Sequence, residues 1–118
     1  MIREMLHAKL HRGAVTDVRP DYEGSLTVDL DLIERAGMLI HQKIAVLNIT
    51  NGQRFETYLI AGERGKREII INGAAARLAL TGDRVIIITY GIYDARELAT
   101  YQPKVVMLNE RNEVVGTH

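Results

Sequence analysis

The stretch from Lys43 to Ile60 reads KIAVLNITNGQRFETYLI, and its pattern favours two β-strands joined by a tight turn. Runs rich in β-branched residues flank Asn51-Gly52 on both sides, as expected for strands. Asn51-Gly52 is a strong two-residue hairpin signal, because both positions of such a turn must accept a positive φ. The stretch therefore predicts a hairpin of Lys43–Ile49 and Arg54–Ile60, in which the turn has a purely structural role.

Short apolar runs with the same period of two continue along the chain and are separated by turn signals, which favours many short strands over long helices. The other predicted strands are Glu4–His11, Val15–Arg19, Leu26–Asp29, Glu68–Ile71, Arg84–Tyr90 and Lys104–Leu108. Short helices are predicted at Leu32–Ala36, capped by Asp31 and followed by Gly37, at Ala74–Leu80 and near Asp94–Ala99. The fold class is therefore all-β, a β-rich barrel with short helices.

The composition fits a single domain over residues 1–118. The 118 residues are 47% hydrophobic, and no linker or low-complexity tract interrupts them. A chain of this size buries only part of its surface, so a deep catalytic cleft would borrow a wall from a second subunit. The size is therefore consistent with an oligomer.

Charge and cysteine content exclude several classes of function. Fifteen Lys plus Arg balance fifteen Asp plus Glu, so no global field attracts nucleic acid. The absence of cysteine excludes disulfides, thiolate metal sites and cysteine nucleophiles. The start, MIREMLHAKLHR, is too charged for a signal peptide, and no later run is long enough to span a membrane. We expect a cytoplasmic protein with no nucleic-acid or membrane partner, and we assign no metal site.

The segment Tyr22-Glu23-Gly24-Ser25 lies between two predicted strands, where a tight turn is the simplest interpretation. The alternative is that Gly24 permits a strained backbone in which the Ser25 hydroxyl attacks the carbonyl of Gly24. That attack would convert the peptide bond to an ester, and β-elimination followed by hydrolysis would leave a pyruvoyl group. Taken alone, the segment favours the turn.

Two strands carry candidate site residues. Lys9 and His11 share one strand face, either as a solvated edge or with Lys9 as a fixed cation in a cleft. Arg54 and Tyr58 also share a face; Arg suits a carboxylate, and Tyr can donate a proton to a carbanion. Thr57 falls on the opposite face, so a site using both Thr57 and Tyr58 needs a bulge or a strong twist. Each residue would fit a plain surface position equally well.

The run Asn72-Gly73-Ala74-Ala75-Ala76 predicts a turn into a short helix. Its small residues would also let backbone N–H groups at a helix N-terminus approach an anion closely. By itself this signal is weak.

Together these segments resemble the pyruvoyl-dependent aspartate 1-decarboxylases, bacterial enzymes of β-alanine and pantothenate synthesis with a double-psi β-barrel fold. The resemblance covers nearly the whole chain and rests on the order and spacing of several segments. These are Met5-Leu6, Lys9-Leu10-His11-Arg12, Tyr22-Glu23-Gly24-Ser25, Thr50-Asn51-Gly52-Gln53-Arg54-Phe55-Glu56-Thr57-Tyr58, Glu63-Arg64-Gly65, Asn72-Gly73-Ala74-Ala75-Ala76 and Gly82-Asp83. Lys66-Arg67 and the C-terminus after Pro103 match less well.

The resemblance implies that the chain cuts itself into residues 1–24, the β chain, and residues 25–118, the α chain. Ser25 would become a covalent pyruvoyl cofactor whose ketone forms a Schiff base with the amino group of L-aspartate. The pyruvoyl group would then serve as the electron sink while the α-carboxylate leaves as CO2. The product would be β-alanine, a precursor of pantothenate and coenzyme A.

The resemblance also implies roles for individual residues. Tyr58 would be the proton donor, and Lys9 and Arg54 would be the substrate-binding cations. Which of the two carboxylates of aspartate each cation binds stays open. Thr57 would assist cleavage at Gly24-Ser25 and lie against the substrate. The other predicted site residues are Asn72, Gly73, Ala74 and Ala75 in the pocket wall, with His11 and Tyr22 in support. The family implies a homotetramer with active sites between subunits. Whether cleavage needs a maturation factor stays open.

Two other classes of protein compete with the enzyme. One is a catalytically silent barrel in which Gly24-Ser25 stays an ordinary turn. The other is a small β-barrel transcription regulator of the swapped-hairpin type, against which the zero net charge counts. A silent barrel has no reason to keep Lys9, Gly24-Ser25, Arg54, Thr57-Tyr58 and Asn72 together. The prediction is therefore the enzyme.

Overall fold

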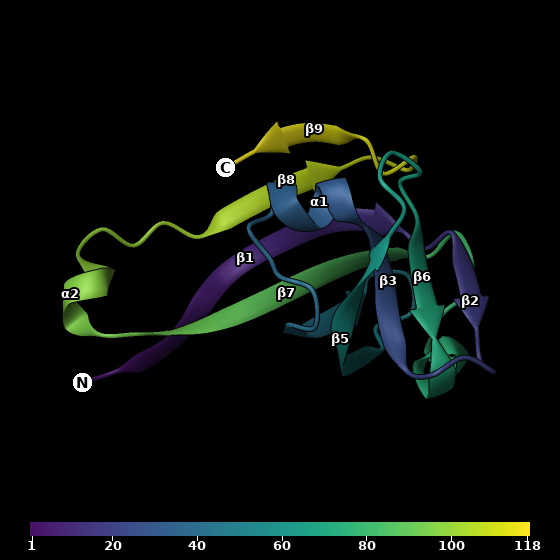
Figure 1. Ribbon diagram of the computed structural model, residues 1–118, viewed down its shortest axis with the longest axis horizontal. Helices are drawn as coiled ribbons and strands as arrows, with labels where there is room; N and C mark the ends of the chain where they lie inside the picture. Colours follow the sequence, from purple (N-terminus) through teal and green to yellow (C-terminus); the bar gives the residue numbers. More distant parts are fainter.

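A computed structural model describes residues 1–118, and most of its ordered elements are β-strands (Figure 1). Nine strands form one sheet in the order β2-β6-β3-β5-β4-β7-β1-β8-β9. The strands are β1 (Arg3–Ala14), β2 (Asp17–Arg19), β3 (Ser25–Asp29), β4 (Lys43–Asn48), β5 (Arg54–Gly62), β6 (Ile69–Asn72), β7 (Arg84–Tyr93), β8 (Lys104–Leu108) and β9 (Val114–Thr117). The helices are α1 (Leu30–Arg35), the 3₁₀-helix η1 (Gly73–Leu78) and α2 (Ala95–Leu98). The all-β prediction is confirmed.

Several strands of the sheet lie between strands that are consecutive in the sequence, and one of them, β5, separates β3 from β4. β6 separates β2 from β3, parallel to the first and antiparallel to the second. β1 likewise separates β7 from β8. Just past β1, the backbone N–H of Thr16 donates to the carbonyl of Ile69 in β6 at 2.8 Å. The sheet therefore curls around a common core, while its double-psi classification stays a prediction.

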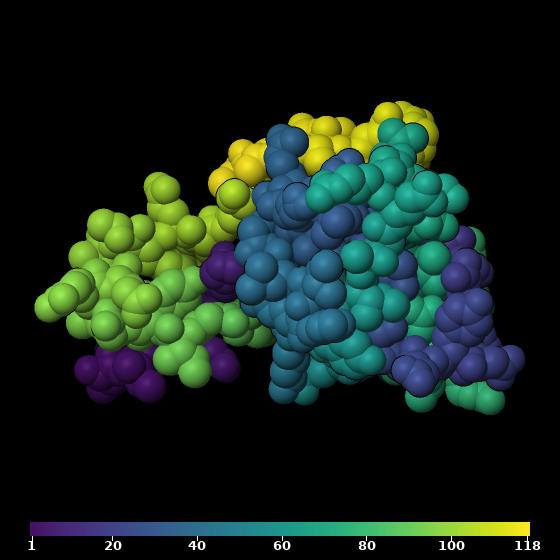
Figure 2. Space-filling view, in the orientation of Figure 1, coloured from purple at the N-terminus to yellow at the C-terminus, as the bar shows by residue number.

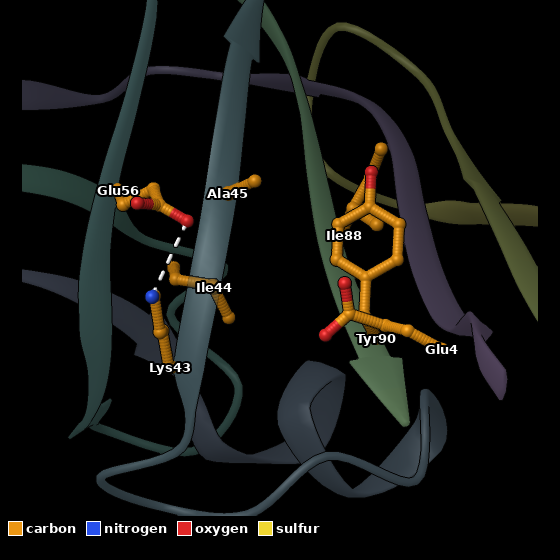
Figure 3. A pocket seen from close by; sticks show the side chains of 7 residues that line it. All are labelled: Glu4, Lys43, Ile44, Ala45, Glu56, Ile88 and Tyr90. Atoms are coloured by element: carbon orange, nitrogen blue, oxygen red, sulfur yellow. Dashed lines mark ion pairs between the residues drawn. The ribbon is translucent and has the colours of Figure 1, made fainter. Parts of the chain in front are cut away.

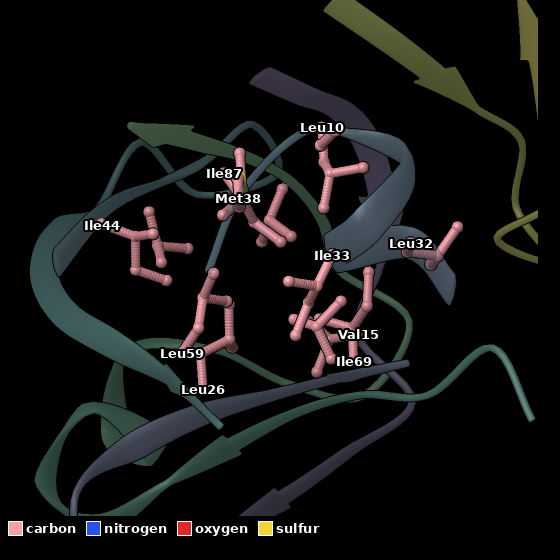
Figure 4. Close-up of a cluster of buried hydrophobic side chains, with 14 of the residues drawn as sticks. Leu10, Val15, Leu26, Leu32, Ile33, Met38, Ile44, Leu59, Ile69 and Ile87 are labelled. Atoms are coloured by element: carbon pink, nitrogen blue, oxygen red, sulfur yellow. The ribbon is translucent and has the colours of Figure 1, made fainter. Parts of the chain in front are cut away.

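A cluster of twenty buried apolar residues fills the inside of the sheet (Figure 4). Leu10, Leu26, Ile44, Leu59 and Ile87 come from five different strands, and each is at most 2% exposed. Full burial of one such side chain stabilises the fold by about 1.5–3 kcal/mol. α1 closes one side of the core with two further buried residues, Leu32 and Ile33.

The predicted hairpin is confirmed, but its turn is not the expected two-residue turn. β4 ends at Asn48 and β5 begins at Arg54, so the loop runs over residues 49–53. In this loop only Gly52 has a positive φ, of 79°. The side-chain Oδ1 of Asn48 accepts hydrogen bonds from the backbone of Thr50 at 2.9 Å and of Asn51 at 3.3 Å. This side chain closes the wider loop, which is why the two-residue prediction was wrong.

The predicted cap of the first helix was also wrong, because Asp29 caps α1 in place of Asp31. Asp29 is 1% exposed, and one carboxylate oxygen accepts from the backbone N–H of Asp31 at 2.8 Å. Its other oxygen accepts from the backbone of Gly65 at 3.0 Å and of Arg67 at 2.7 Å. Asp29 thus joins the end of β3 to α1 and to the loop after β5. Asp31 instead forms an exposed ion pair with Arg64.

One end of the molecule projects from the body as an arm (Figures 1 and 2). We use "arm" for residues 1–6 together with residues 90–101, which include α2. The molecule measures 43 × 27 × 25 Å. Ile2, Tyr90 and Ile92 of the arm are exposed large hydrophobic residues. None of the helices is both long and apolar enough to cross a membrane.

Candidate active site

Ser25 and Asn72 form the centre of the candidate site. Ser25 begins β3 and pairs directly with Asn72 at the end of β6, and the two residues are 3% and 2% exposed. The amide Nδ2 of Asn72 donates to Ser25 Oγ at 3.1 Å and to Thr27 Oγ1 at 2.9 Å. Its Oδ1 is buried and has no hydrogen-bond partner. An N–H held on a hydroxyl oxygen stabilises negative charge that develops there, which suits Ser25 as a nucleophile.

Gly73 holds the backbone that precedes Ser25. It has a φ of 76°, and a Cβ at this position would lie 2.5 Å from Cα and 2.7 Å from N of Gly24. Only glycine fits such an approach. Gly24 itself has no positive φ, and a Cβ there would meet no atom within 4 Å. The backbone constraint predicted for Gly24 is therefore found at Gly73.

The loop before Ser25 crosses the end of β6. Arg19 pairs with Asn72 from the β2 side, whereas Ser25 pairs with it from the β3 side. The exposed ring of Tyr22 lies under the Arg19 guanidinium, 5.3 Å from ring centroid to Cζ. Tyr22 N also donates to the Arg19 carbonyl at 3.2 Å. Tyr22 therefore anchors the loop that carries Gly24.

β5 lies beside β3 and brings Tyr58 to the site. The parallel register pairs Leu26 with Leu59, so Ser25 and Tyr58, the residues just before them, lie side by side. Tyr58 is 39% exposed. Thr57 is half-buried and projects from the opposite face, and β5 shows no register shift in either ladder. The bulge that would bring Thr57 and Tyr58 to one face is therefore absent from this chain.

The predicted cations lie on another part of the sheet. Cross-strand pairs project to the same side, so two rows of paired residues define one surface, which we call the outer face. Each row crosses β5, β4, β7 and β1 in that order. The first row is Arg54, Leu47, Ile86 and His11. The second row is Glu56, Ala45, Ile88 and Lys9. Lys9 lies on β1, which three strands separate from β3. Arg54 is about 13 Å from Tyr58 along β5. Neither cation adjoins Ser25 of its own chain.

A recess on the outer face is lined by charged and apolar side chains (Figure 3). Lys43 and Glu56 form an ion pair of 3.5 Å in it, and Tyr90 and Glu4 lie across β4 from them. None of the surface pockets is lined by Ser25. Ser25 of the single uncleaved chain is therefore closed to a substrate.

His11 is surrounded by positive charge. Its Nδ1 is buried and has no hydrogen-bond partner. Burial, and then the nearby cations Lys9, Arg12 and Arg84, lower the pKa of His11 below its ordinary value of 6.5. His11 is therefore neutral at pH 7 and cannot act as a further fixed cation.

The small residues after Asn72 form a 3₁₀-helix where an ordinary helical turn was expected. Ala74 is exposed and Ala75 is half-buried, and the Asn72 side chain makes no capping hydrogen bond to η1. The first N–H groups of η1 thus have no side-chain cap. No group of three His, Asp or Glu side chains is arranged to hold a metal ion.

Two residues near the site were not found by sequence reasoning. Thr27 binds the Asn72 amide, and its position two residues after Ser25 on one strand was a usable signal. His41 packs edge-on against Tyr58, with ring centroids 6.3 Å apart. No pattern in the sequence predicts that contact, because β4 lies between the two residues in the sequence.

Comparison with known proteins places the chain in a family. The sequence profile described as "Aspartate decarboxylase" matches residues 1–115. A protein of Sulfurimonas denitrificans named "Aspartate 1-decarboxylase" is 51% identical over 97% of this chain and 94% of its own length. A protein of the same name from Leptospira biflexa is 54% identical over 95% of this chain and 96% of its own length. Another, from Thermoanaerobacter pseudethanolicus, is 51% identical over 98% of this chain and 99% of its own length. The chain therefore belongs to the aspartate decarboxylase family.

Proposed function

We propose that this chain cuts itself between Gly24 and Ser25 and then decarboxylates L-aspartate to β-alanine and CO2, a step of pantothenate and coenzyme A synthesis. The covalent cofactor would be a pyruvoyl group made from Ser25. The observation that carries the proposal is the hydrogen bond of 3.1 Å from the buried Asn72 amide to Ser25 Oγ. Family membership supports the reaction.

The cleavage balances without an external reagent other than water. Ser25 Oγ bonds to the carbonyl carbon of Gly24, the bond from that carbon to Ser25 N breaks, and the hydroxyl proton passes to N. Loss of the Ser25 Cα proton then breaks the Cβ–Oγ bond, so that Gly24 leaves as a carboxylate and a dehydroalanine remains. Water replaces its nitrogen, ammonia leaves, and a pyruvoyl group results.

The chain's own residues fit these steps. The Asn72 N–H contacts the oxygen that becomes first the nucleophile and then the ester oxygen. Gly73 packs against Gly24 and so restrains the carbonyl that is attacked. Thr57, on the strand that pairs with β3, would assist the cleavage and touch the substrate. Asn72, Gly73, Ala74 and Ala75 would form one wall of the substrate pocket.

In the decarboxylation, a pyruvoyl group supplies the electron sink for the bond to the departing carboxylate. Tyr58, beside Ser25 across the β3–β5 ladder, would return a proton to the carbon that loses CO2. Lys9 and Arg54 would bind the two carboxylates of aspartate. Tyr22 and His11 would support the site from the loop before Ser25 and from the outer face.

The positions of the cations support active sites between subunits of a homotetramer. Lys9 and Arg54 lie on the outer face, away from Ser25 of the same chain. The outer face also carries half-buried apolar residues, and the arm exposes Ile2 and Ile92. Contact between copies would cover these surfaces and bring the cations of one chain to Ser25 of another. A cytoplasmic location and the absence of a nucleic-acid or membrane partner stay predictions.

Intact-mass analysis of the purified chain tests the proposal. We expect the single mass to be replaced by two, residues 1–24 and 25–118, with the larger piece lacking a free α-amino group. Borohydride should attach aspartate covalently to that larger piece and to no other.

A chain that keeps one mass and does not trap aspartate would be a silent barrel. Cleavage only after addition of cell extract would show that a maturation factor is required. As a control, Ser25→Ala should remain uncut and inactive while it assembles normally.

A further inference from the structure

The hydroxyl of Thr27 accepts a hydrogen bond from the Asn72 side chain, and the same side chain donates to Ser25. Ser25 and Thr27 are two residues apart on β3 and project from one face of the strand. The Asn72 amide lies between their hydroxyls, and its bond to Thr27, at 2.9 Å, is shorter than its bond to Ser25, at 3.1 Å. Thr27 is itself fixed on both sides, because it pairs with Ile60 of β5 and Ile70 of β6.

The Asn72 amide has no other anchor. Its two N–H donors are used by Thr27 and Ser25, and its Oδ1 is buried without a partner. A buried amide oxygen with no donor does nothing to hold the amide plane in one orientation. Without the Thr27 hydroxyl, the only remaining contact would be Ser25, the group on which Asn72 is to act.

We propose that Thr27 is a positioning residue for self-cleavage, which keeps the Asn72 N–H directed at Ser25 Oγ. This inference rests on the proposed cleavage between Gly24 and Ser25. With one lone pair of Oγ bound by the Asn72 N–H, another lone pair is free to form the bond to the Gly24 carbonyl carbon. The same N–H then stabilises that oxygen as the Cβ–Oγ bond breaks and the Gly24 carboxylate leaves.

Two matched pairs of side chains at position 27 test the hydroxyl apart from the rest of the side chain. Thr and Val have the same shape and differ in the hydroxyl, and Ser and Ala differ in the same way. Cleavage of each chain is followed by intact mass from the uncut state. We expect Thr27→Val and Thr27→Ala to cut at least about tenfold more slowly than wild type and Thr27→Ser, as for loss of one orienting hydrogen bond. Turnover per cleaved chain is measured in parallel.

A purely structural role makes a different prediction. The cleavage rates would then follow the unfolding midpoints of the four chains instead of the presence of the hydroxyl, and the proposal would be wrong. Equal rates within both pairs would also overturn it, while cleavage of the wild type would still stand. A wild-type chain that never cuts would remove the proposed function itself.

A second background tests whether Thr27 acts through Asn72. In an Asn72→Ala chain, Thr27→Val should cause no further slowing, because the amide that Thr27 positions is gone. Independent and additive slowing would contradict the inference. If Thr27→Val fails to fold, the Thr27→Ser and Thr27→Ala pair gives the same comparison.

Discussion

Gly73 is the residue at which the backbone leaves no choice of side chain. An alanine Cβ there would lie 2.5 Å from Gly24 Cα, so the segment before Ser25 would have to move. We expect Gly73→Ala to slow cleavage at Gly24–Ser25 by at least about a hundredfold, because a displacement near 1 Å has that effect on a reacting group. Intact-mass analysis over time measures the rate.

Gly37 provides the matched control for this substitution. Its φ is 72°, close to that of Gly73, but no atom lies within 4 Å of a Cβ built there. Gly37→Ala therefore has the same backbone strain of about 1–2 kcal/mol without the collision. It should lower the unfolding midpoint and leave the cleavage rate unchanged. Equal slowing in both variants would mean that strain alone, and not contact with Gly24, explains the effect.

His11 should make stability depend on pH. Its pKa is lowered from 6.5 by burial and by the nearby cations, so between the two values the unfolded chain binds more protons than the folded chain. The stability that neutral His11 contributes is complete above the pKa of His11 in the unfolded chain. It is lost as the pH falls from 6.5 toward the pKa of His11 in the folded chain. We expect the denaturant midpoint to fall between about pH 7.5 and about pH 5.5, and to fall less in His11→Gln. His118→Gln, at the exposed C-terminus, should behave like the wild type.

At the scale of residues, the sequence could predict which side chains matter better than how they are held. Ser25, Asn72 and Tyr58 were predicted, and their strands do lie side by side. The Thr27 hydrogen bond and the contact of Gly73 with Gly24 depend on how β3 and β6 pair, and strand pairing between distant segments leaves no local pattern. The resemblance to a family predicted which residues belong to the site, whereas their contacts follow from the register of β3 with β5 and β6.

At the scale of elements, the β8–β9 hairpin was only half predicted. β8 was found from its apolar run, whereas β9, Val114–Thr117, is short and half-exposed and has little periodicity to detect. Asn112, in the turn before β9, ties this hairpin to the end of β1. It is 1% exposed, its Oδ1 accepts from Ala14 N at 2.6 Å, and its Nδ2 donates to the carbonyls of Ala14 and Arg67, both at 2.9 Å.

We expect Asn112→Ala to lower the free energy of unfolding by about 2–3 kcal/mol, because it leaves buried backbone groups of Ala14 and Arg67 without a partner. Asn109→Ala is the matched control, since the Asn109 Oδ1 accepts only from Arg111 N and Glu113 N of the same turn. That change should cost about 1 kcal/mol or less. Denaturant unfolding at one fixed protein concentration measures both, and equal losses would show that the link to β1 adds nothing.

At the scale of the molecule, the predicted site residues of the single chain do not all lie together. Size and resemblance predicted active sites between subunits, and within the single chain Lys9 and Arg54 lie away from Ser25. The sequence pattern alone could not have given this separation, because it depends on the strand order, in which three strands lie between β1 and β3. Ser25 itself is buried in the single chain, and no surface pocket is lined by it.

Shared active sites lead to a test by mixing two inactive chains. A Ser25→Ala chain has the cations but no cofactor, and an Arg54→Ala chain has the cofactor but lacks one cation. If Ser25 and Arg54 of one site come from different subunits, co-expression in equal amounts should restore about a quarter of the wild-type sites by random assembly. Activity is measured per assembled protein and compared with each variant expressed alone. Complementation requires that the two residues belong to different chains, so a mixture no more active than the two variants separately would return both residues to a single subunit.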